Sequence, residues 1–343
     1  MKGLYSNSRF FCLLICICFC ISSFIITNSY RPNRLHTITG FAQGTSYSIQ
    51  YLCDSNSVVK NEIDSIFKVL DYNFSLYSNT SLIKDFNQAP RGISITPHLS
   101  HVITCAKDIH ARSHGSFDIA ILNLLSLWGK GKKQDFTPPS PNEINNTLIN
   151  SGSHWIIIQN DSLVKLNPNV QIDCDGIAQG YSVDVLASYL DAKNISNYLV
   201  EIGGEVKSKG KNTQGADWRI GFTTASLQNN VLSNQQVLGI SGWACTTSGR
   251  LSKFTGTPTQ KISHIINPTS GYPVNNGIVS VTVIAKDAII ADAYDNAFMV
   301  MGIDKAFALL KDNKDLGVHF VYEPTPGHFK DTANAFFKSF INQ

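Results

Sequence analysis

Apolar residues recur along the chain with two spacings, one typical of helices and one typical of strands. Residues 58–72, 177–190 and 290–302 carry apolar side chains three and four positions apart, which predicts a helix in each segment. Short apolar runs bounded by turn residues predict strands. These runs occupy residues 155–159, 163–166, 198–202, 206–209, 218–222, 237–240 and 278–284. Asn-Asp-Ser separates the first two runs, which predicts a hairpin there.

Capping residues indicate further helices. Thr96 followed by Pro97 is typical of a helix N-terminus, and Gly115 is typical of its end. Ser140 and Glu143 have the spacing of a capping box, which predicts another short helix. Runs of strands mixed with four or five helices, without strict alternation, predict an α+β fold.

Composition places this pattern in a globular protein. Of the 343 residues, 43% are hydrophobic and 15% are charged, so the chain can bury one large core or two modest ones. We expect one continuous domain. Because the formal net charge is only +3, nothing indicates electrostatic capture of nucleic acid.

The N-terminal segment differs from the rest of the chain. Phe10 to Ile26 is an uncharged, mainly apolar run that follows two basic residues, as in a secretory signal or a short membrane anchor. We expect residues 1–29 to deliver the following domain to the periplasmic side of the inner membrane. A lipid anchor is the second choice, because Ile15 precedes Cys16 where a lipid-attachment box needs a small residue.

Four cysteines lie beyond this segment, and their spacing fits no zinc or redox motif. In an oxidising compartment they allow one or two disulfides. Buried free thiols are an equal alternative in a domain with an adequate core. These residues are Cys53, Cys105, Cys174 and Cys245.

The predicted helix at 290–302 carries three oxygen-bearing side chains on one face. Asp292, Asp295 and Asn296 stand at positions i, i+3 and i+4. Two carboxylates and an amide oxygen this close together favour a hard cation, magnesium or calcium, over zinc. The alternative is a helix that begins with acids to complement its dipole.

The segment 173–184 predicts a ligand-binding turn. Gly176 precedes the predicted helix at 177–190, so its backbone can approach a ligand closely. The N-terminus of that helix would attract an anion such as a pyrophosphate. The alternative is a tight strand-to-helix turn that uses glycine for its geometry alone.

Together these segments resemble the FAD:protein FMN transferase (ApbE) family. The main match is the run from Ser263 to Gly271, Ser-His-Ile-Ile-Asn-Pro-Thr-Ser-Gly, followed by Ala-Asp-Ala at residues 291–293. Further ordered matches extend the resemblance over residues 38–340. They are Gly44-Thr45, Phe74 to Ser78, Ser116-Phe117-Asp118, Leu127 to Gly131, Asp173 to Asp184, Glu201 to Glu205 and Thr247-Ser248-Gly249.

The resemblance implies both a fold and an activity. The fold is a single T-fold-related α+β domain, with mixed antiparallel sheets and packed helices, over residues 38–340. The activity is Mg²⁺-dependent transfer of the FMN half of FAD to a Thr or Ser hydroxyl of a partner, with release of AMP. The expected acceptor is a flavin-carrying subunit of a membrane redox complex. An FAD pyrophosphatase and a non-catalytic FAD-binding protein are the alternatives.

The resemblance also assigns site residues by position. Magnesium would be held by the Gly176 carbonyl, Asp292, Asp295 and Asn296, the last of which stands where Thr is commonest. His264 would orient or deprotonate the acceptor hydroxyl. The residues expected to contact FAD are Gln43, Tyr77, Ser116, Phe117, Asp118, Asp173, Gln179 and Ile266.

Several of these residues have a simpler interpretation. Tyr77 and Phe117 are of a type that more often fills a core than supports a ligand. His264 can instead be a structural histidine bonded to a backbone carbonyl. Gln43 replaces the Met usual in the family, and Gln179 replaces a Lys or Glu.

Overall fold

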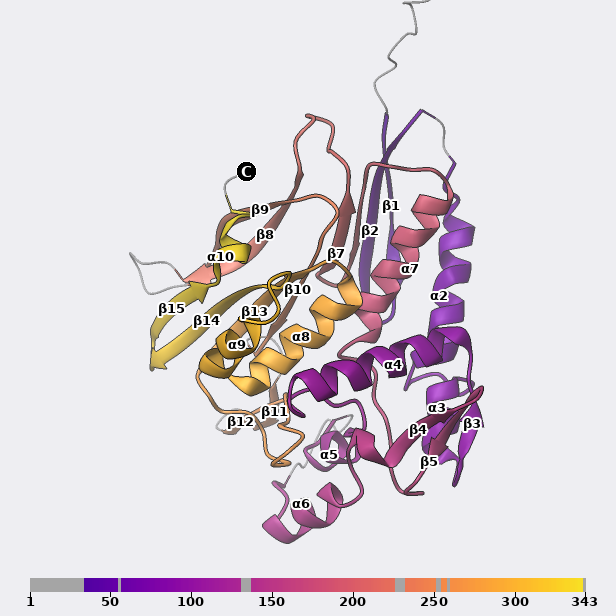
Figure 1. The fold of residues 1–343 in the computed structure, drawn as a ribbon, viewed down its shortest axis with the longest axis vertical. Helices are drawn as coiled ribbons and strands as arrows, with labels where there is room; N and C mark the ends of the chain where they lie inside the picture. Colours follow the sequence, from indigo (N-terminus) through magenta and orange to yellow (C-terminus); the bar gives the residue numbers. More distant parts are fainter. Residues whose placement is uncertain are drawn as a thin grey trace, which may run out of the picture. The chain divides into compact units, whose positions relative to one another are not determined.

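An antiparallel sheet of eight strands forms the centre of the protein (Figure 1). The computed structural model describes residues 34–54, 57–130, 137–225, 232–250, 254–257 and 260–341, apart from the side chains of residues 233–235 and 254–262. Leu35–Gln343 form one compact unit. The predicted signal or anchor at residues 1–29 lies outside the described residues. In the part of the chain that is described, no helix is long and apolar enough to cross a membrane.

From β2 to β15, every neighbouring pair of strands in this sheet is antiparallel. The α+β fold predicted from the sequence is therefore confirmed. In spatial order the strands are β1 (Arg34–Ala42), β2 (Thr45–Cys53), β6 (Tyr198–Ile202), β7 (Glu205–Lys209), β10 (Ala244–Gly249), β13 (Ile278–Ala285), β14 (Gly317–Thr325) and β15 (His328–Ala333).

The middle of the sheet is covered on both faces. Consecutive strand residues point to opposite faces, and in β13 Val283 packs in one core with Phe298 while Ile284 packs in another with Phe337. The first core includes α8 (Ala288–Met301), and the second includes α10 (Ala335–Lys338) and the hairpin of β8 (Trp218–Ala225) and β9 (Leu232–Ile240). All eight residues of β13 are consequently buried, which explains why apolar residues occur on both of its faces.

The remaining elements surround this sheet. Helix α7 (Ala178–Ala192) packs on β6 and β7 beside α8. The other helices are α2 (Lys60–Phe74), α3 (Leu82–Gln88), α4 (Pro97–Arg112), α5 (Leu122–Leu127), α6 (Pro141–Leu148) and α9 (Ile303–Leu310). The smaller strands are β3 (Gly92–Ser94), β4 (Ile156–Gln159), β5 (Ser162–Lys165), β11 (Phe254–Thr257) and β12 (Gln260–Ser263), of which β4 and β5 are the predicted hairpin.

Local sequence signals set the helix boundaries. The Thr96 side chain accepts a hydrogen bond from the Leu99 N–H at the start of α4, and the Ser140–Glu143 capping box is present at α6. Val59 was expected within the first helix, but it precedes α2 and is 50% exposed. The apolar face of that helix begins at Ile63 instead.

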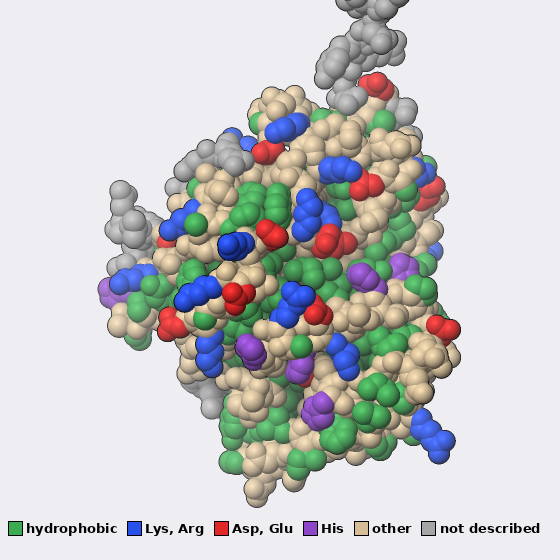
Figure 2. All heavy atoms as spheres, viewed as in Figure 1, with side chains coloured by type: hydrophobic (Ala, Val, Ile, Leu, Met, Phe, Trp, Pro, Cys, Tyr) green, Lys and Arg blue, Asp and Glu red, His purple; other side chains and the backbone are tan. Residues whose placement is uncertain are grey.

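The four described cysteines are free thiols, of which Cys174 and Cys245 are buried. Of the two interpretations of the cysteines, free thiols are therefore the one observed. On the face drawn in Figure 2, basic and acidic side chains are interspersed, as expected from the small net charge.

Candidate functional site

A cleft of about 730 Å³ brings together segments that lie far apart in the sequence. Its walls come from the loop after α4, the turn before α7, β10, the segment after β12, and α8. Every predicted site residue except Gln43 lines it. The lining residues predicted from the sequence are Tyr77, Ser116, Phe117, Asp118, Asp173, Gly176, Gln179, His264, Ile266, Asp292, Asp295 and Asn296.

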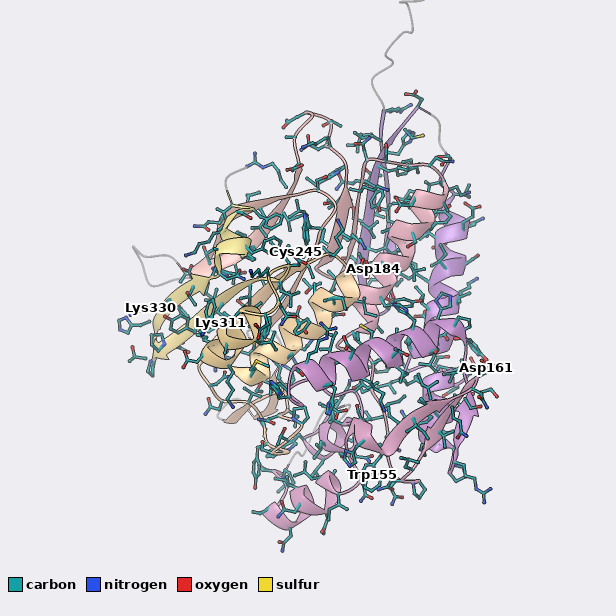
Figure 3. All side chains as sticks on the ribbon, in the orientation of Figure 1. Trp155, Asp161, Asp184, Cys245, Lys311 and Lys330 are labelled. Atoms are coloured by element: carbon teal, nitrogen blue, oxygen red, sulfur yellow. The ribbon has the colours of Figure 1, made fainter. Side chains whose placement is uncertain are left out.

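Helices α7 and α8 cap each other beside this cleft. The Asp292 carboxylate of α8 accepts a hydrogen bond from the Gly180 N–H in the first turn of α7, at 2.8 Å. In return, Asp184 of α7, which is labelled in Figure 3, accepts from the N–H groups of Ala288 and Ile289, at 3.0 and 2.9 Å. A Cβ at position 180 would lie 2.3 Å from the Ala288 carbonyl oxygen, so this approach requires glycine.

This geometry excludes the alternative in which the acids complement the dipole of their own helix. Helix α8 begins at Ala288 and has no acid in its first turn. Asp292 lies in the second turn and bonds to the N-terminus of α7 instead.

Four groups converge at one end of the cleft. The Asn296 side-chain nitrogen donates to Asp295 Oδ1 at 3.0 Å, and it lies 3.4 Å from the Gly176 carbonyl oxygen and 3.5 Å from Asp292 Oδ1. Ser248 Oγ donates to Asn296 Oδ1 at 3.4 Å, which places β10 beside the cluster. The three side chains and the backbone carbonyl therefore surround one small volume.

The donor set fits a hard cation. Asp292 and Asp295 are 4% and 1% exposed, and burial together with the negative charge of Asp292 raises the pKa of Asp295 well above its ordinary value. The described residues contain no group of three His, Cys, Asp or Glu side chains arranged to hold a metal. A cation here would need the Gly176 carbonyl oxygen and the Asn296 amide oxygen as well as the two carboxylates, which is the preference of magnesium and calcium. In this structure the Asn296 amide turns its nitrogen toward the carboxylates and its oxygen toward Ser248, so the amide would have to flip to supply that oxygen.

Gly176 is held close to this cluster. A Cβ at this position would lie 3.3 Å from the Asn296 side-chain nitrogen. Glycine therefore lets the backbone lie close to Asn296, while its approach to a ligand stays a prediction.

The aromatic residues of the cleft differ in exposure. Tyr77 is 81% exposed at the cleft, so it is not a core residue. Phe117 is 6% exposed and belongs to the main hydrophobic core, with its edge on the cleft. Phe117 thus packs in the core and also lines the cleft.

Asp118 organises the loop that carries Phe117. Its carboxylate accepts hydrogen bonds from the N–H groups of Ala120 and Ser153, and it lies 3.1 Å from His110 Nδ1. Burial raises the pKa of Asp118, but the hydrogen bonds from His110 and Ser153 outweigh burial and lower it overall. The hydrogen bond to Asp118 also raises the pKa of His110.

The side chains of Gln43 and Gln179 both form hydrogen bonds within the protein. Gln43 lies in the turn between β1 and β2, and its side chain donates to Ser182 Oγ of α7 at 2.9 Å. Gln179 lines the cleft and donates to the Ile202 carbonyl oxygen at 3.3 Å. The structure thus places Gln43 against α7, outside the residues that line the cleft.

His264 and Ile266 lie in a tight hairpin at the cleft. Asn267 closes the Pro-Thr-Ser-Gly turn that follows it, because its side chain accepts from the N–H groups of Thr269 and Ser270. Ile266 is buried, while His264 is partly exposed on the cleft wall. This arrangement gives His264 access to a ligand in the cleft.

The sequence assigned no role to Lys130 and Asp175, two charged residues of the cleft wall. Lys130 Nζ forms ion pairs with Asp173 and, at 2.7 Å, with Asp175. Their sequence signal is their place in two matched motifs, since Lys130 directly follows Leu-Trp-Gly and Asp175 ends Asp-Cys-Asp. Tertiary structure brings the two motifs together.

Three N–H groups at the N-terminus of α7, where the sequence predicts an anion site, form hydrogen bonds within the protein, and the anion site stays a prediction. The N–H groups of Ile177 and Ala178 donate to the Cys174 carbonyl oxygen, and that of Gly180 donates to Asp292. These donors are already satisfied within the fold. A phosphate in the cleft needs positive charge from other groups.

The fold and the cleft define an α+β protein with a cleft of about 730 Å³ and two buried carboxylates at one end of it. The ApbE family matches residues 43–320, so the chain belongs to that family. It is 31% identical over 330 residues to the FAD:protein FMN transferase of Vibrio cholerae, covering 94% of this chain and 97% of the relative. It is 30% identical to the FAD:protein FMN transferase of Escherichia coli K12, covering 82% of each chain.

Solved structures agree with this assignment. The flavin transferase ApbE from Vibrio cholerae has a TM-score of 0.81 at 30% identity, covering 90% of this chain and all of that one. The flavinyl transferase ApbE of Pseudomonas stutzeri, in its apo form, has a TM-score of 0.80 at 29% identity, covering 91% and 98%. The chain is thus an enzyme homologous to FAD:protein FMN transferases over most of its length.

Proposed function

We propose that this protein transfers the FMN moiety of FAD to a Thr or Ser hydroxyl of a partner protein in a magnesium-dependent reaction that releases AMP. The observation that carries the proposal is the convergence of Asp292, Asp295, Asn296 and the Gly176 carbonyl at one end of the cleft. The volume of about 730 Å³ is within the range of small-molecule sites.

The cation would be held by those four groups. When bound, it supplies positive charge that neutralises the phosphate oxygens during phosphoryl transfer. The exposed Tyr77 and the edge of Phe117 offer aromatic surface to the flat rings of FAD. The reaction then depends mainly on alignment of the attacking hydroxyl with the phosphate.

His264 is the proposed general base. The acceptor oxygen forms a bond to the phosphorus of the FMN half, the bond from that phosphorus to the bridging oxygen breaks, and AMP leaves. The proton of the hydroxyl passes to the imidazole. The partial exposure of His264 on the cleft wall supports this role.

The proposal is tested by incubating the protein with FAD and Mg²⁺, with and without a candidate acceptor. Flavin fluorescence on the acceptor band, together with AMP, supports transfer. AMP and free FMN without acceptor would instead establish an FAD pyrophosphatase. If FAD binds but neither AMP nor FMN forms, the protein binds FAD without catalysing a reaction.

The metal set is tested by Asp292→Asn, which keeps an oxygen for the Gly180 N–H but removes the charge. We expect AMP release to fall by about 10² or more at limiting Mg²⁺, with FAD binding retained. Asp108→Asn, in an exposed pair with Arg112 on α4, is the matched control. Full activity of Asp292→Asn at limiting Mg²⁺ would remove the metal assignment.

We further propose that the acceptor is a flavin-carrying subunit of a membrane redox complex on the periplasmic side of the inner membrane. The support is the uncharged run from Phe10 to Ile26 in the sequence. Pull-down with the inactive Asp292→Asn variant, followed by flavin assay of the captured subunits, tests this partner.

A further inference from the structure

The cleft is strongly acidic for a site that must take up an anion. Among the described residues that line it, Lys130 is the single lysine or arginine. The lining acids are Asp118, Asp173, Asp175, Glu205, Asp292 and Asp295. The diphosphate of a dinucleotide would be repelled by this set unless cationic groups met it.

Lys130 lies between two acids of different exposure. Its Nζ pairs with Asp173, whose side chain is 4% exposed, and with Asp175, whose side chain is 49% exposed. Burial lowers the pKa of Lys130, but the attraction of the two carboxylates outweighs burial, so the amine stays charged.

The two pairs differ in how firmly they are held. Asp173 is fixed by the Asp175 N–H, which donates to its Oδ1 at 2.9 Å, and it is buried. The Asp175 side chain faces solvent, where an ion pair contributes little. Lys130 can therefore give up Asp175 at low cost while it keeps Asp173.

Backbone donors nearby cannot replace this charge. The N–H groups at 177, 178 and 180, at the start of α7, are already bonded within the protein. Lys130 is consequently the cationic side chain of the described wall that an incoming phosphate would meet.

We propose that Lys130 exchanges its exposed partner Asp175 for the diphosphate of FAD when the nucleotide binds, and that Asp175 thereby limits nucleotide affinity. This inference rests on the proposed function. It predicts that removing the charge of Asp175 strengthens FAD binding through Lys130.

The test measures affinity by quenching of flavin fluorescence with EDTA present, so that no turnover contributes. Lys130→Met should weaken FAD binding by roughly tenfold, whereas Lys130→Arg should stay close to wild type. Asp175→Asn, which keeps the backbone bond to Asp173, should tighten binding by roughly two- to five-fold. Riboflavin, which has no phosphate, should bind all variants equally.

A double-mutant cycle distinguishes two models: exchange of Asp175 for the phosphate on Lys130, and direct repulsion between Asp175 and the phosphate. Asp175→Asn should tighten FAD binding more in the Lys130 background than in the Lys130→Met background. Equal gains in both backgrounds would overturn the exchange, because Asp175 would then act on the phosphate directly. Equal losses of FAD and riboflavin in Lys130→Met would also overturn it.

These outcomes are distinguishable from failure of the proposed function. If the wild-type protein binds no FAD, the proposed function fails and the inference fails with it. If it binds FAD but Asp175→Asn brings no gain, only the inference fails. Melting temperatures of every variant establish that each one is folded.

Discussion

The carboxylates of Asp292 and Asp295 are held where their charges repel each other. Both are buried, and the pKa of Asp295 is raised by burial and by Asp292. A fold retains such an arrangement at a cost in stability when the site needs it for a ligand. The neutral Asn296 amide contacts both carboxylates and limits the charge of the cluster to two acids.

Asp295→Asn should therefore stabilise the metal-free protein while weakening the cation site. The substitution keeps Oδ1 as an acceptor for Asn296 but removes a buried charge. We expect a gain of about 1 to 2 kcal/mol in the free energy of unfolding without metal. Thermal unfolding with EDTA and with Mg²⁺ measures both effects. A lower melting temperature in EDTA would contradict the expectation.

The pair of His110 and Asp118 predicts a pH dependence of stability. The hydrogen bond to Asp118 raises the pKa of His110, against the opposing effects of partial burial and of Lys107. A raised folded-state pKa gives stability that is fully present below about pH 6.5 and is lost as pH rises through the folded value. Between pH 6 and 8, the melting temperature should fall more for the wild type than for His110→Asn.

Below pH 5, the melting temperatures of wild type and His110→Asn report on the titration of Asp118 instead of His110. The pKa of Asp118 is lowered, so its contribution is present above about pH 3.9 and is lost as pH falls. Identical pH profiles of wild type and His110→Asn between pH 6 and 8 would exclude the proposed contribution of His110.

Helices α7 and α8 form one structural unit, because Asp292 of α8 and Asp184 of α7 each accept hydrogen bonds from the N-terminus of the other helix. Asp184 also pairs with Lys207 of β7 at 2.7 Å, and Lys207 pairs with Asp287 at the start of α8. The turn that carries Gly176 and the helix that carries the two site aspartates are thereby fixed relative to each other. The spacing of the metal set depends on this unit.

Asp184→Ala should destabilise the protein by about 3 kcal/mol. It leaves two N–H groups of α8 without their acceptor and Lys207 without its buried partner. Asp108→Ala, which breaks an exposed pair, should cost less than about 1 kcal/mol. Urea denaturation measures the free energy of unfolding of both variants. Equal losses of stability would argue against a capping role of Asp184.

For the whole molecule, we expect the N-terminal segment to determine the compartment in which the domain works. A reporter fused after Asn28 should reach the periplasm if residues 1–29 form an export segment. A fusion that lacks residues 1–29 is the control and should remain in the cytosol. Cytosolic recovery of the longer fusion would overturn the assignment.

Most helices and strands, and most residues that line the cleft, could be predicted from local sequence patterns. Capping residues at Thr96 and Ser140 and the periodicity of 177–190 act over a few positions, so local chemistry was enough to predict these helices. Motif spacing likewise predicted that Asp292, Asp295 and Asn296 share one face of α8, because residues three and four apart on a helix are neighbours.

Only the tertiary structure decided which distant groups meet. Asp292 bonds to Gly180 and Lys130 pairs with Asp173 and Asp175, although each partner lies far away in the sequence. No local pattern encodes such contacts, because they depend on how helices pack across the sheet. For the same reason the sequence does not show that three N–H groups at the start of α7 bond to a carboxylate from another helix and to a nearby carbonyl.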